Sequence, residues 1–181
     1  MSVLSIIALI SGSLGVWLTI RQTIWCWPVS LIAVLASITE FYNERLYGDM
    51  SLQIFYLFAG LYGWAYWNKN KNAAFTVTKT DLKQVPLLIA LTVAQAVVYY
   101  FLISYFKGDR PVLDSILTAS SLTATYMMTK KWVENWLCWV FIDATYIVLY
   151  GLKHMWLFAL LNLLFTIIAS YGWLKWRRTV S

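Results

Sequence analysis

Charged residues are scarce in this chain of 181 residues, because only 12% are Asp, Glu, Lys or Arg, whereas a typical soluble domain has about 25%. Histidine occurs once and cysteine twice. Cys26 and Cys138 lie within apolar runs, with no His, Asp or Cys at metal-ligand spacing nearby, so the sequence predicts neither a disulfide nor a metal site. These shortages exclude a soluble enzyme, a disordered tail and a disulfide-stabilised scaffold.

Apolar residues are abundant instead, at 61% of the chain, and 18% of the residues are aromatic. One soluble core of this length cannot bury so much apolar surface. A bilayer core about 30 Å thick needs roughly 20 apolar residues per helix. Seven stretches qualify: Val3 to Ile20, Ile24 to Tyr42, Met50 to Trp67, Val85 to Phe106, Val112 to Met128, Asn135 to Gly151 and Met155 to Trp176. The sequence therefore predicts an all-α polytopic membrane protein with seven transmembrane helices.

The net charge of +6 comes from basic residues in the gaps between these stretches, which favours a topology signal over nucleic-acid binding. Ten Lys and Arg residues follow the first, third and fifth spans or close the chain, and four lie on the other side. The positive-inside rule then places the N-terminus outside and the C-terminus in the cytoplasm. Because no basic residue precedes the first span, we expect that span to stay in the membrane rather than be cleaved as a signal.

Three short signatures recur in the same order and suggest a duplication. They pair Cys26-Trp27 with Cys138-Trp139, Leu46-Tyr47-Gly48 with Leu149-Tyr150-Gly151, and Tyr62-Gly63-Trp64-x-x-Trp67 with Tyr171-Gly172-Trp173-x-x-Trp176, at offsets of 112, 103 and 109. The last pair ends spans three and seven, so the copies are predicted to be parallel repeats, as in SWEET-type sugar transporters. This predicts a first three-helix bundle (1–67), a cytoplasmic loop (68–84), a linking helix (85–106) and a second three-helix bundle (112–176).

Two stretches also carry a family pattern. One reads Lys131-Trp132-Val133-Glu134-Asn135-Trp136-Leu137-Cys138-Trp139-Val140, and the other combines Leu46-Tyr47-Gly48, Leu52-Gln53-Ile54-Phe55 and Tyr62-Gly63-Trp64-x-x-Trp67. They resemble the PnuC family of bacterial vitamin transporters, whose signature is Lys-Tyr-Val-Glu-Asn-Trp-Leu-x-Trp-Val and whose third helix carries Trp-x-x-Trp. The resemblance covers nearly the whole chain.

That resemblance implies uptake of a water-soluble vitamin across the inner membrane through seven core helices in a three-one-three arrangement. Nicotinamide riboside carriers are the best-known members, and relatives carry thiamine or riboflavin. It further implies facilitated diffusion made one-way by phosphorylation of the substrate in the cytoplasm, with no cofactor. The lack of a Gly-x-x-x-x-Gly-Lys-Ser/Thr motif agrees with transport that does not use an ATPase.

Asp143 lies near the middle of the sixth span, eight residues from Asn135 and eight from Gly151. A carboxylate at the bilayer centre costs about 3 kcal/mol unless it faces a wet cavity or a partner. Nicotinamide riboside and thiamine both carry a fixed positive charge on an aromatic ring, which such a carboxylate would complement. The alternative is a structural aspartate bonded to Ser or Thr of the fifth span. Some members that resemble nicotinamide riboside carriers have Asn here, which leaves the choice of vitamin open.

Aromatic side chains attract a cationic ring through cation-π interaction. Trp136 and Trp139, in the inner half of the sixth span, and Tyr146, one turn beyond Asp143, are candidates to line a pathway. Trp64 and Trp67 are further candidates, but they and their counterparts Trp173 and Trp176 end spans at the cytoplasmic interface. An aromatic belt at that interface is the favoured alternative for these four.

Three amides complete the candidate site. Gln53 and Asn162 occupy the third helix of each repeat and could read the carboxamide of nicotinamide or the aminopyrimidine of thiamine, although interhelical hydrogen bonding is the alternative. Asn135 is a candidate as well, and its alternative role is to cap the sixth helix.

The leading interpretation is a vitamin carrier, and the remote alternative is an integral membrane enzyme. Such an enzyme usually needs clustered acids or His residues at membrane depth, and this chain offers Asp143 almost alone. The expected partners are a small-molecule vitamin and membrane lipid, with no nucleic acid. The sequence leaves a homo-oligomer open.

Overall fold

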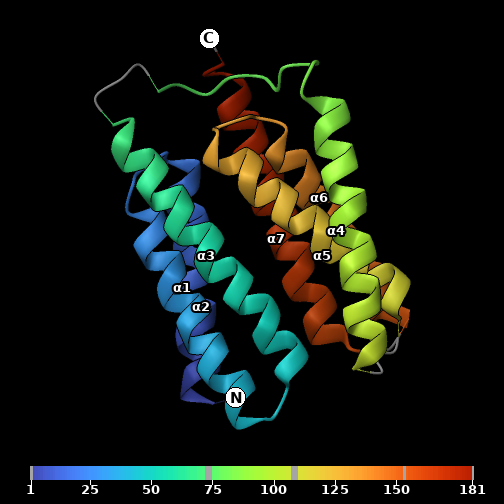
Figure 1. Cartoon of the computed structure of the whole chain (residues 1–181). Coiled ribbons are helices and arrows are strands. Elements are labelled where there is room, and N and C mark those ends of the chain that lie inside the picture. Colours follow the sequence, from blue (N-terminus) through green and yellow to red (C-terminus); the bar gives the residue numbers. More distant parts are fainter. Residues whose placement is uncertain (1, 72–74, 107–109, 153, 181) are drawn as a thin grey trace. The chain divides into compact units, whose positions relative to one another are not determined.

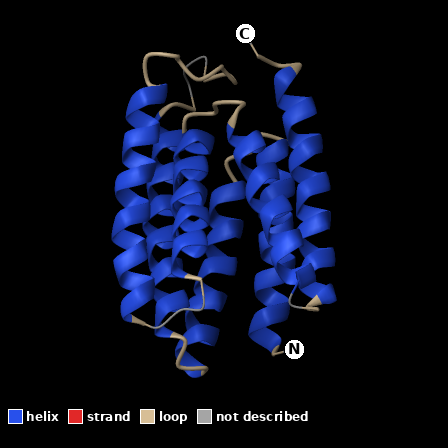
Figure 2. Cartoon of the chain, turned by 90° about the vertical axis from the view of Figure 1, so that its right-hand side faces the viewer, coloured by secondary structure: helices blue, strands red, loops and turns tan. Residues whose placement is uncertain are grey.

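The computed structural model of the chain describes residues 2–71, 75–106, 110–152 and 154–180 (Figure 1). These residues form seven helices joined by loops, and no strand occurs among them (Figure 2). In chain order the helices are α1 (Val3–Ile20), α2 (Cys26–Asn43), α3 (Tyr47–Lys69), α4 (Val85–Tyr105), α5 (Pro111–Thr129), α6 (Asn135–Leu152) and α7 (Trp156–Arg177). Every predicted span is one of these helices, with ends that differ by at most three residues, so the all-α seven-helix prediction is confirmed.

Length and composition alone mark four described helices as able to cross a membrane, namely α1, α4, α6 and most of α7. Among the other helices, α3 and α5 are rich in Ser, Thr, Trp, Tyr or Gly, whereas α2 carries Pro28, Glu40 and Asn43. All three prolines of the chain lie in the first turn of a helix, at Pro28, Pro86 and Pro111. A proline in the first turn breaks no intrahelical hydrogen bond, so each helix continues without interruption.

The chain divides into two compact units. Unit 1 comprises Met1–Phe75 and Phe101–Pro111, and unit 2 comprises Thr76–Tyr100 and Val112–Ser181. Within unit 1, α2 packs against both α1 and α3, and within unit 2, α6 packs against α7. The helix α4 contributes residues to both units. The finer division into two bundles, a loop and a linking helix stays a prediction.

The backbone of unit 1 recurs in unit 2 at one constant offset of 109 residues. The described part of the chain has four non-glycine residues with positive φ: Gln22 (57°), Arg45 (59°), Lys131 (55°) and His154 (57°). They form two pairs separated by 109 positions, Gln22 with Lys131 and Arg45 with His154. The N-caps of α3 and α7 pair in the same way, since Leu46 has φ −87° and ψ 66° and Met155 has φ −90° and ψ 63°.

Hydrogen bonds in the turns follow the same offset. The N–H of Gln22 donates to the carbonyl of Thr19 at 2.8 Å, and the N–H of Lys131 donates to that of Met128 at 3.0 Å. Bonds of this kind close a helix through a residue in the left-handed region. Equal turns at equal spacing support the duplication that the sequence predicts, while the orientation of the two copies stays a prediction.

A tryptophan pair seated on a glycine is the shared packing feature of the two copies. In unit 1 the rings of Trp27 and Trp67 meet edge to face, with centroids 5.6 Å apart and an interplanar angle of 86°. In unit 2 the rings of Trp136 and Trp176 meet at 5.4 Å and 89°. All four side chains are buried, and edge-to-face pairs of this kind are the favoured aromatic geometry.

A glycine on the third helix of each copy makes room for the first indole. A Cβ on Gly63 would lie 2.5 Å from Cζ2 of Trp27, and a Cβ on Gly172 would lie 2.7 Å from Cδ2 of Trp136. These distances are below those of real Cβ contacts, so only glycine lets the helix approach the ring this closely. The requirement explains why Tyr-Gly-Trp-x-x-Trp occurs twice.

The constant offset corrects two of the three sequence signatures. The counterpart of Trp27 is Trp136 and not Trp139, because Trp136 makes the equivalent packing with Gly172 and Trp176. Leu46 precedes α3 as its N-cap, whereas Leu149 lies inside α6, so these two tripeptides are not equivalent. Chance matches are common in a chain with eleven Trp and twelve Tyr. The third signature has the offset that the structure shows.

Candidate functional site

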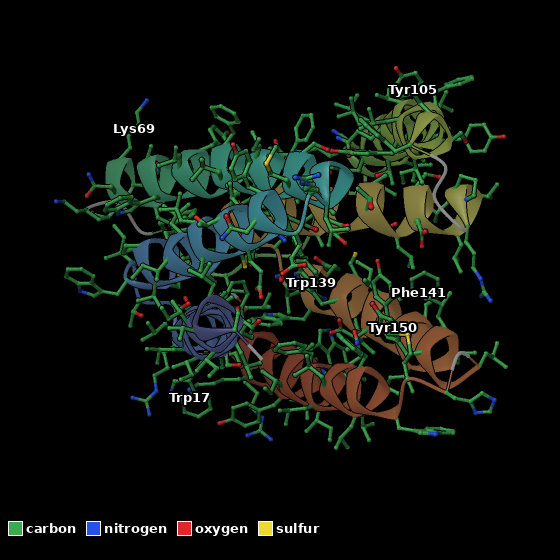
Figure 3. The ribbon with its side chains drawn as sticks, turned by 90° about the horizontal axis from the view of Figure 1, so that it is seen from below. Trp17, Lys69, Tyr105, Trp139, Phe141 and Tyr150 are labelled. Atoms are coloured by element: carbon green, nitrogen blue, oxygen red, sulfur yellow. The ribbon has the colours of Figure 1, made fainter. Side chains whose placement is uncertain are left out.

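One stripe along α6 collects four of the nine candidate residues. Its members recur at alternating steps of three and four, which places them on one face of a helix. They are Trp136, Trp139, Asp143, Tyr146 and Tyr150. We call this set the α6 stripe. Figure 3 shows Trp139 and Tyr150 of the stripe, and also Phe141, which belongs to another face of α6 and is 62% exposed.

The C-terminal part of the stripe continues onto α7 as a series of rings. Tyr146 stacks on Tyr150 with centroids 5.7 Å apart and planes at 19°. Tyr150 in turn lies 5.4 Å from Phe158 of α7, at 32°. The amide Nδ2 of Asn162 then donates to the carbonyl of Phe158 at 2.8 Å. The structure therefore links two predicted residues, Tyr146 and Asn162, through two that were not predicted as site residues, Tyr150 and Phe158.

Asp143, Trp139 and Tyr146 are all half-buried in the middle of the stripe. This environment gives a carboxylate a partly shielded position among ring faces, at a depth where an ionisable group usually marks a functional pathway. The counterpart position in the first copy is apolar, because the residue 109 positions before Asp143 is Val34. A carboxyl group at this position of the repeat therefore occurs only in the second copy.

Gln53 and Asn162 are counterparts at the offset of 109 and both are half-buried. The prediction that they occupy corresponding third helices agrees with the backbone register, since Gln53 lies on α3 and Asn162 on α7. The side-chain amide of Asn162 donates one hydrogen bond to the carbonyl of Phe158 on the same helix. Whether either amide contacts a substrate stays a prediction.

Asn135 and Trp136 lie at the start of α6 and are almost fully buried, at 0% and 2% exposure. Nδ2 of Asn135 donates to the carbonyl of Trp132 at 2.6 Å, so this side chain closes the turn before the helix. Its Oδ1 atom and Nε1 of Trp136 are buried and have no hydrogen-bond partner among the described residues. Buried polar atoms are rarely left in this state, so this region has spare capacity for one donated and one accepted hydrogen bond.

The two tryptophans of the third-helix motif differ in environment. Trp64 is 40% exposed, as a membrane-interface residue would be, whereas Trp67 is 3% exposed and packs on Trp27. Their counterparts repeat the difference, since Trp173 is half-buried and Trp176 has no exposed surface. The belt interpretation is therefore wrong for Trp67 and Trp176, because both lie inside their units.

The family motif around Glu134 contacts the loop segment that contains Thr78 and Thr80. Thr78 forms a parallel β-bridge with Trp132. In this bridge the N–H of Thr78 donates to the carbonyl of Lys131, and the N–H of Val133 donates to the carbonyl of Thr78. The carboxylate Oε2 of Glu134 accepts two further bonds from Thr80, from its N–H at 2.9 Å and from its hydroxyl at 2.8 Å. We call these contacts the loop latch. Sequence reasoning missed it because Thr80 is 54 residues away and nothing local marks it as a partner.

The loop latch gives a direct prediction. Replacing Glu134 with alanine leaves the N–H and hydroxyl of Thr80 without this acceptor, and bonds to a charged group contribute about 1.5–3 kcal/mol. We expect the amides of Thr80 and Val133 to exchange hydrogen for deuterium at least tenfold faster, with little change in α1. Glu134→Gln keeps an acceptor oxygen and should restore most of the protection. Unchanged exchange in Glu134→Ala would show that the backbone bridge alone holds the loop.

Both cysteines are free thiols, and no group of three or more His, Cys, Asp or Glu side chains that could hold a metal ion is found in the described part of the chain. Cys26 is buried, while Cys138 is half-buried and its sulfur lies 4.0 Å from that of Met127.

Comparison with known proteins places this geometry in a family. A model described as "Nicotinamide mononucleotide transporter" matches residues 2–178. The nicotinamide riboside transporter PnuC of Escherichia coli is 27% identical over 195 residues, covering 92% of this chain and 82% of that protein. The riboflavin/roseoflavin transporter RibM of Streptomyces davaonensis is 26% identical over 145 residues, covering 77% of this chain and 66% of that protein.

A solved structure agrees at the level of the fold. The crystal structure of the vitamin B3 transporter PnuC superposes with a TM-score of 0.77 and 22% identity, covering 97% of this chain and 80% of that chain. The seven helices, the two family motifs and the match over almost the whole length lead to one conclusion. The chain belongs to the nicotinamide mononucleotide transporter family, the PnuC family of multi-pass membrane transporters.

Proposed function

We propose that this protein carries nicotinamide riboside across the bacterial inner membrane by facilitated diffusion, with phosphorylation in the cytoplasm trapping the substrate. The observation that carries the proposal is Asp143, a carboxylate at membrane depth within a stripe of aromatic rings on α6. The relative of Escherichia coli that bears the name of a nicotinamide riboside transporter supports the choice of substrate.

The physical match is between a flat cation and the α6 stripe. The pyridinium ring of nicotinamide riboside carries a fixed positive charge, which a carboxylate attracts strongly where water is scarce. Each aromatic ring adds about 0.5–2 kcal/mol when it faces a cation. In this proposal Asp143 balances the charge, while Trp139 and Tyr146 stack on the ring. Trp136 contributes its buried indole N–H, which has no hydrogen-bond partner among the described residues.

The amides supply the remaining recognition. A carboxamide offers one acceptor and two donors, and Gln53, Asn162 and Asn135 can meet them. Of these, Asn135 retains a buried oxygen without a partner among the described residues. Trp64 and Trp67 are proposed to contact the substrate at the end of α3. Trp64 is partly exposed there, and Trp67 packs on Trp27 of α2.

The proposal also includes the topology. The excess of Lys and Arg on one side supports an outside N-terminus and a cytoplasmic C-terminus. The proposal keeps the predicted division into two three-helix bundles (1–67 and 112–176), joined through the loop 68–84 and the linking helix 85–106. In this proposal the protein is a transporter and not an enzyme, and it contacts membrane lipid. A homo-oligomer is compatible with the proposal.

Two other vitamins are alternatives by the same mechanism. Thiamine is also a cationic aromatic, and the carboxylate of Asp143 suits it equally well. Riboflavin is favoured by the name of the Streptomyces relative, but it is uncharged and would gain little from Asp143. The charge of the substrate therefore separates riboflavin from the two cationic vitamins, nicotinamide riboside and thiamine.

The test is binding of nicotinamide riboside, thiamine and riboflavin to the detergent-purified protein, measured by quenching of tryptophan fluorescence. We expect nicotinamide riboside to bind most tightly, and Asp143→Asn to weaken it at least tenfold, about 1.4 kcal/mol. Asp81→Asn makes the same chemical change outside the helices and should leave binding unchanged. If riboflavin binds best and Asp143→Asn has no effect, the proposal is wrong. If thiamine alone binds, the substrate is thiamine and not nicotinamide riboside.

A further inference from the structure

In the described part of the chain, three helices carry an aromatic ring in their last turns with a cation above it. The guanidinium carbon of Arg21 lies 5.3 Å from the ring centroid of Trp17 on α1. Nζ of Lys130 lies 5.5 Å from the centroid of Tyr126 on α5, and the guanidinium carbon of Arg177 lies 4.9 Å from that of Trp173 on α7. In each pair the cation follows the ring by four residues, one helical turn. We call these the ring–cation pairs.

Two of the ring–cation pairs are counterparts in the duplicated backbone. Trp17 and Arg21 correspond to Tyr126 and Lys130 at the offset of 109, and both cations sit where the helix terminates. The N–H of Arg21 donates to the carbonyl of Trp17 at 3.2 Å, and the N–H of Lys130 donates to that of Tyr126 at the same distance. The residue types differ between the copies, yet an aromatic ring and a cation remain in both. The chemistry of the pair is thus retained where the individual residues are not.

Two of the three rings lie on the outside of their units, since Trp17 is 42% and Tyr126 39% exposed, and the third ring, of Trp173, is half-buried. Arg21 and Arg177 are exposed, and Lys130 is half-buried. A large amphipathic ring at the end of a transmembrane helix settles at the level of the lipid headgroups. A cation held over that ring is therefore fixed at the depth of the lipid phosphates, with its long side chain lying along the apolar surface.

We propose that the three ring–cation pairs bind the phosphate groups of anionic phospholipids, so that the protein is stabilised by phosphatidylglycerol-type lipids and not by zwitterionic ones. A basic side chain near an anionic surface contributes about 1 kcal/mol, which is roughly a fivefold change in affinity for each charge. The neighbouring cations support the same preference. In unit 2, Lys175 and Arg178 flank Arg177, and α7 ends with three basic residues within four positions.

The experiment titrates delipidated protein in detergent with short-chain phosphatidylglycerol and follows the thermal unfolding midpoint, Tm. The test variant combines Arg21→Gln, Lys130→Gln and Arg177→Gln. The control variant, Lys69→Gln, Lys79→Gln and Lys83→Gln, removes the same net charge from cations for which the described structure shows no ring beneath them. Each variant is compared with its own lipid-free Tm, so a loss of intrinsic stability does not disturb the comparison.

We expect phosphatidylglycerol to raise Tm of the unmodified protein, with phosphatidylcholine and inorganic phosphate having little effect at equal concentration. The half-saturating lipid concentration should rise more than tenfold in the test variant and less than threefold in the control. A second variant, Trp17→Leu with Tyr126→Leu, keeps every cation and should also weaken the effect. Equal losses in test and control variants, equal stabilisation by phosphatidylcholine, or stabilisation by free phosphate would each overturn the assignment.

Discussion

Replacing Gly63 with alanine is expected to lower the free energy of unfolding by about 3 kcal/mol, at the upper end of the usual cost of overpacking. The new Cβ would overlap the six-membered ring of Trp27, whose atoms Cη2, Cζ3 and Cζ2 are the nearest to it. This ring is buried and packs on Trp67, so it cannot move aside without breaking the tryptophan pair. Thermal or denaturant unfolding in detergent micelles measures the loss.

Two controls make the Gly63 prediction specific. A Cβ on Gly12 would meet that of Ala33 at 3.7 Å, an ordinary contact, so Gly12→Ala on α1 should cost less than about 1 kcal/mol. Adding Trp27→Leu to Gly63→Ala removes the ring that obstructs the Cβ. The double variant should then be less destabilised than the sum of its two single changes. Simple additivity would mean that the cost arises elsewhere.

The Trp-x-x-Trp motif gives the second large effect, because replacing its two members should lower stability by very different amounts. Trp67→Ala removes a buried indole and leaves a cavity beside Trp27, for which the expected loss is about 3–5 kcal/mol. Trp64→Ala removes a side chain that is 40% exposed, and its effect on stability should stay below about 1 kcal/mol. Unfolding of the two single variants in the same detergent makes the comparison.

The second copy provides the matched pair. Trp176→Ala should behave as Trp67→Ala does, since Trp176 is fully buried against Trp136. Trp173→Ala should resemble Trp64→Ala in stability while losing the ring below Arg177. Comparable losses for Trp64 and Trp67 would contradict the burial described above and return both residues to a common interfacial role.

The helices could be predicted from the sequence because each apolar run is long and is closed by polar or basic residues. Even the boundaries came within three residues, since a membrane span has a nearly fixed length. The register of the repeat could not be predicted in full. It rests on features with no sequence signal, such as left-handed turns at Gln22 and Lys131 that contain no glycine. Trp27 could be matched with Trp136 only once both rings were seen against their glycines.

The sequence predicts the site residues whose type is unusual at membrane depth. It does not predict contacts between residues that lie far apart in the chain. Asp143 stands out because a carboxylate is rare at membrane depth, and the rings spaced around it on α6 follow from helical periodicity. The same periodicity marks Tyr150, although the sequence analysis did not include it. Phe158 carries no such signal, because it lies on α7 and meets the stripe only through its ring contact with Tyr150. The partnership of Thr80 with Glu134 likewise joins residues distant in the chain.

The four left-handed turn residues have a consequence for how the protein reaches its membrane orientation. Glycine would adopt positive φ with less strain than Arg45 or Lys131, by about 1 kcal/mol at each position. Glycine would also remove a cation from the connecting segments, where the balance of Lys and Arg directs insertion before any turn has formed. At Lys131, which lies on the side with ten of the fourteen Lys and Arg residues, biogenesis and final stability therefore make opposing demands on the same residue. A glycine there would relieve backbone strain in the folded protein and weaken the charge bias that directs insertion, so a more stable fold would come with a larger fraction of chains inserted the wrong way round. At Arg45, on the other side, the two demands agree.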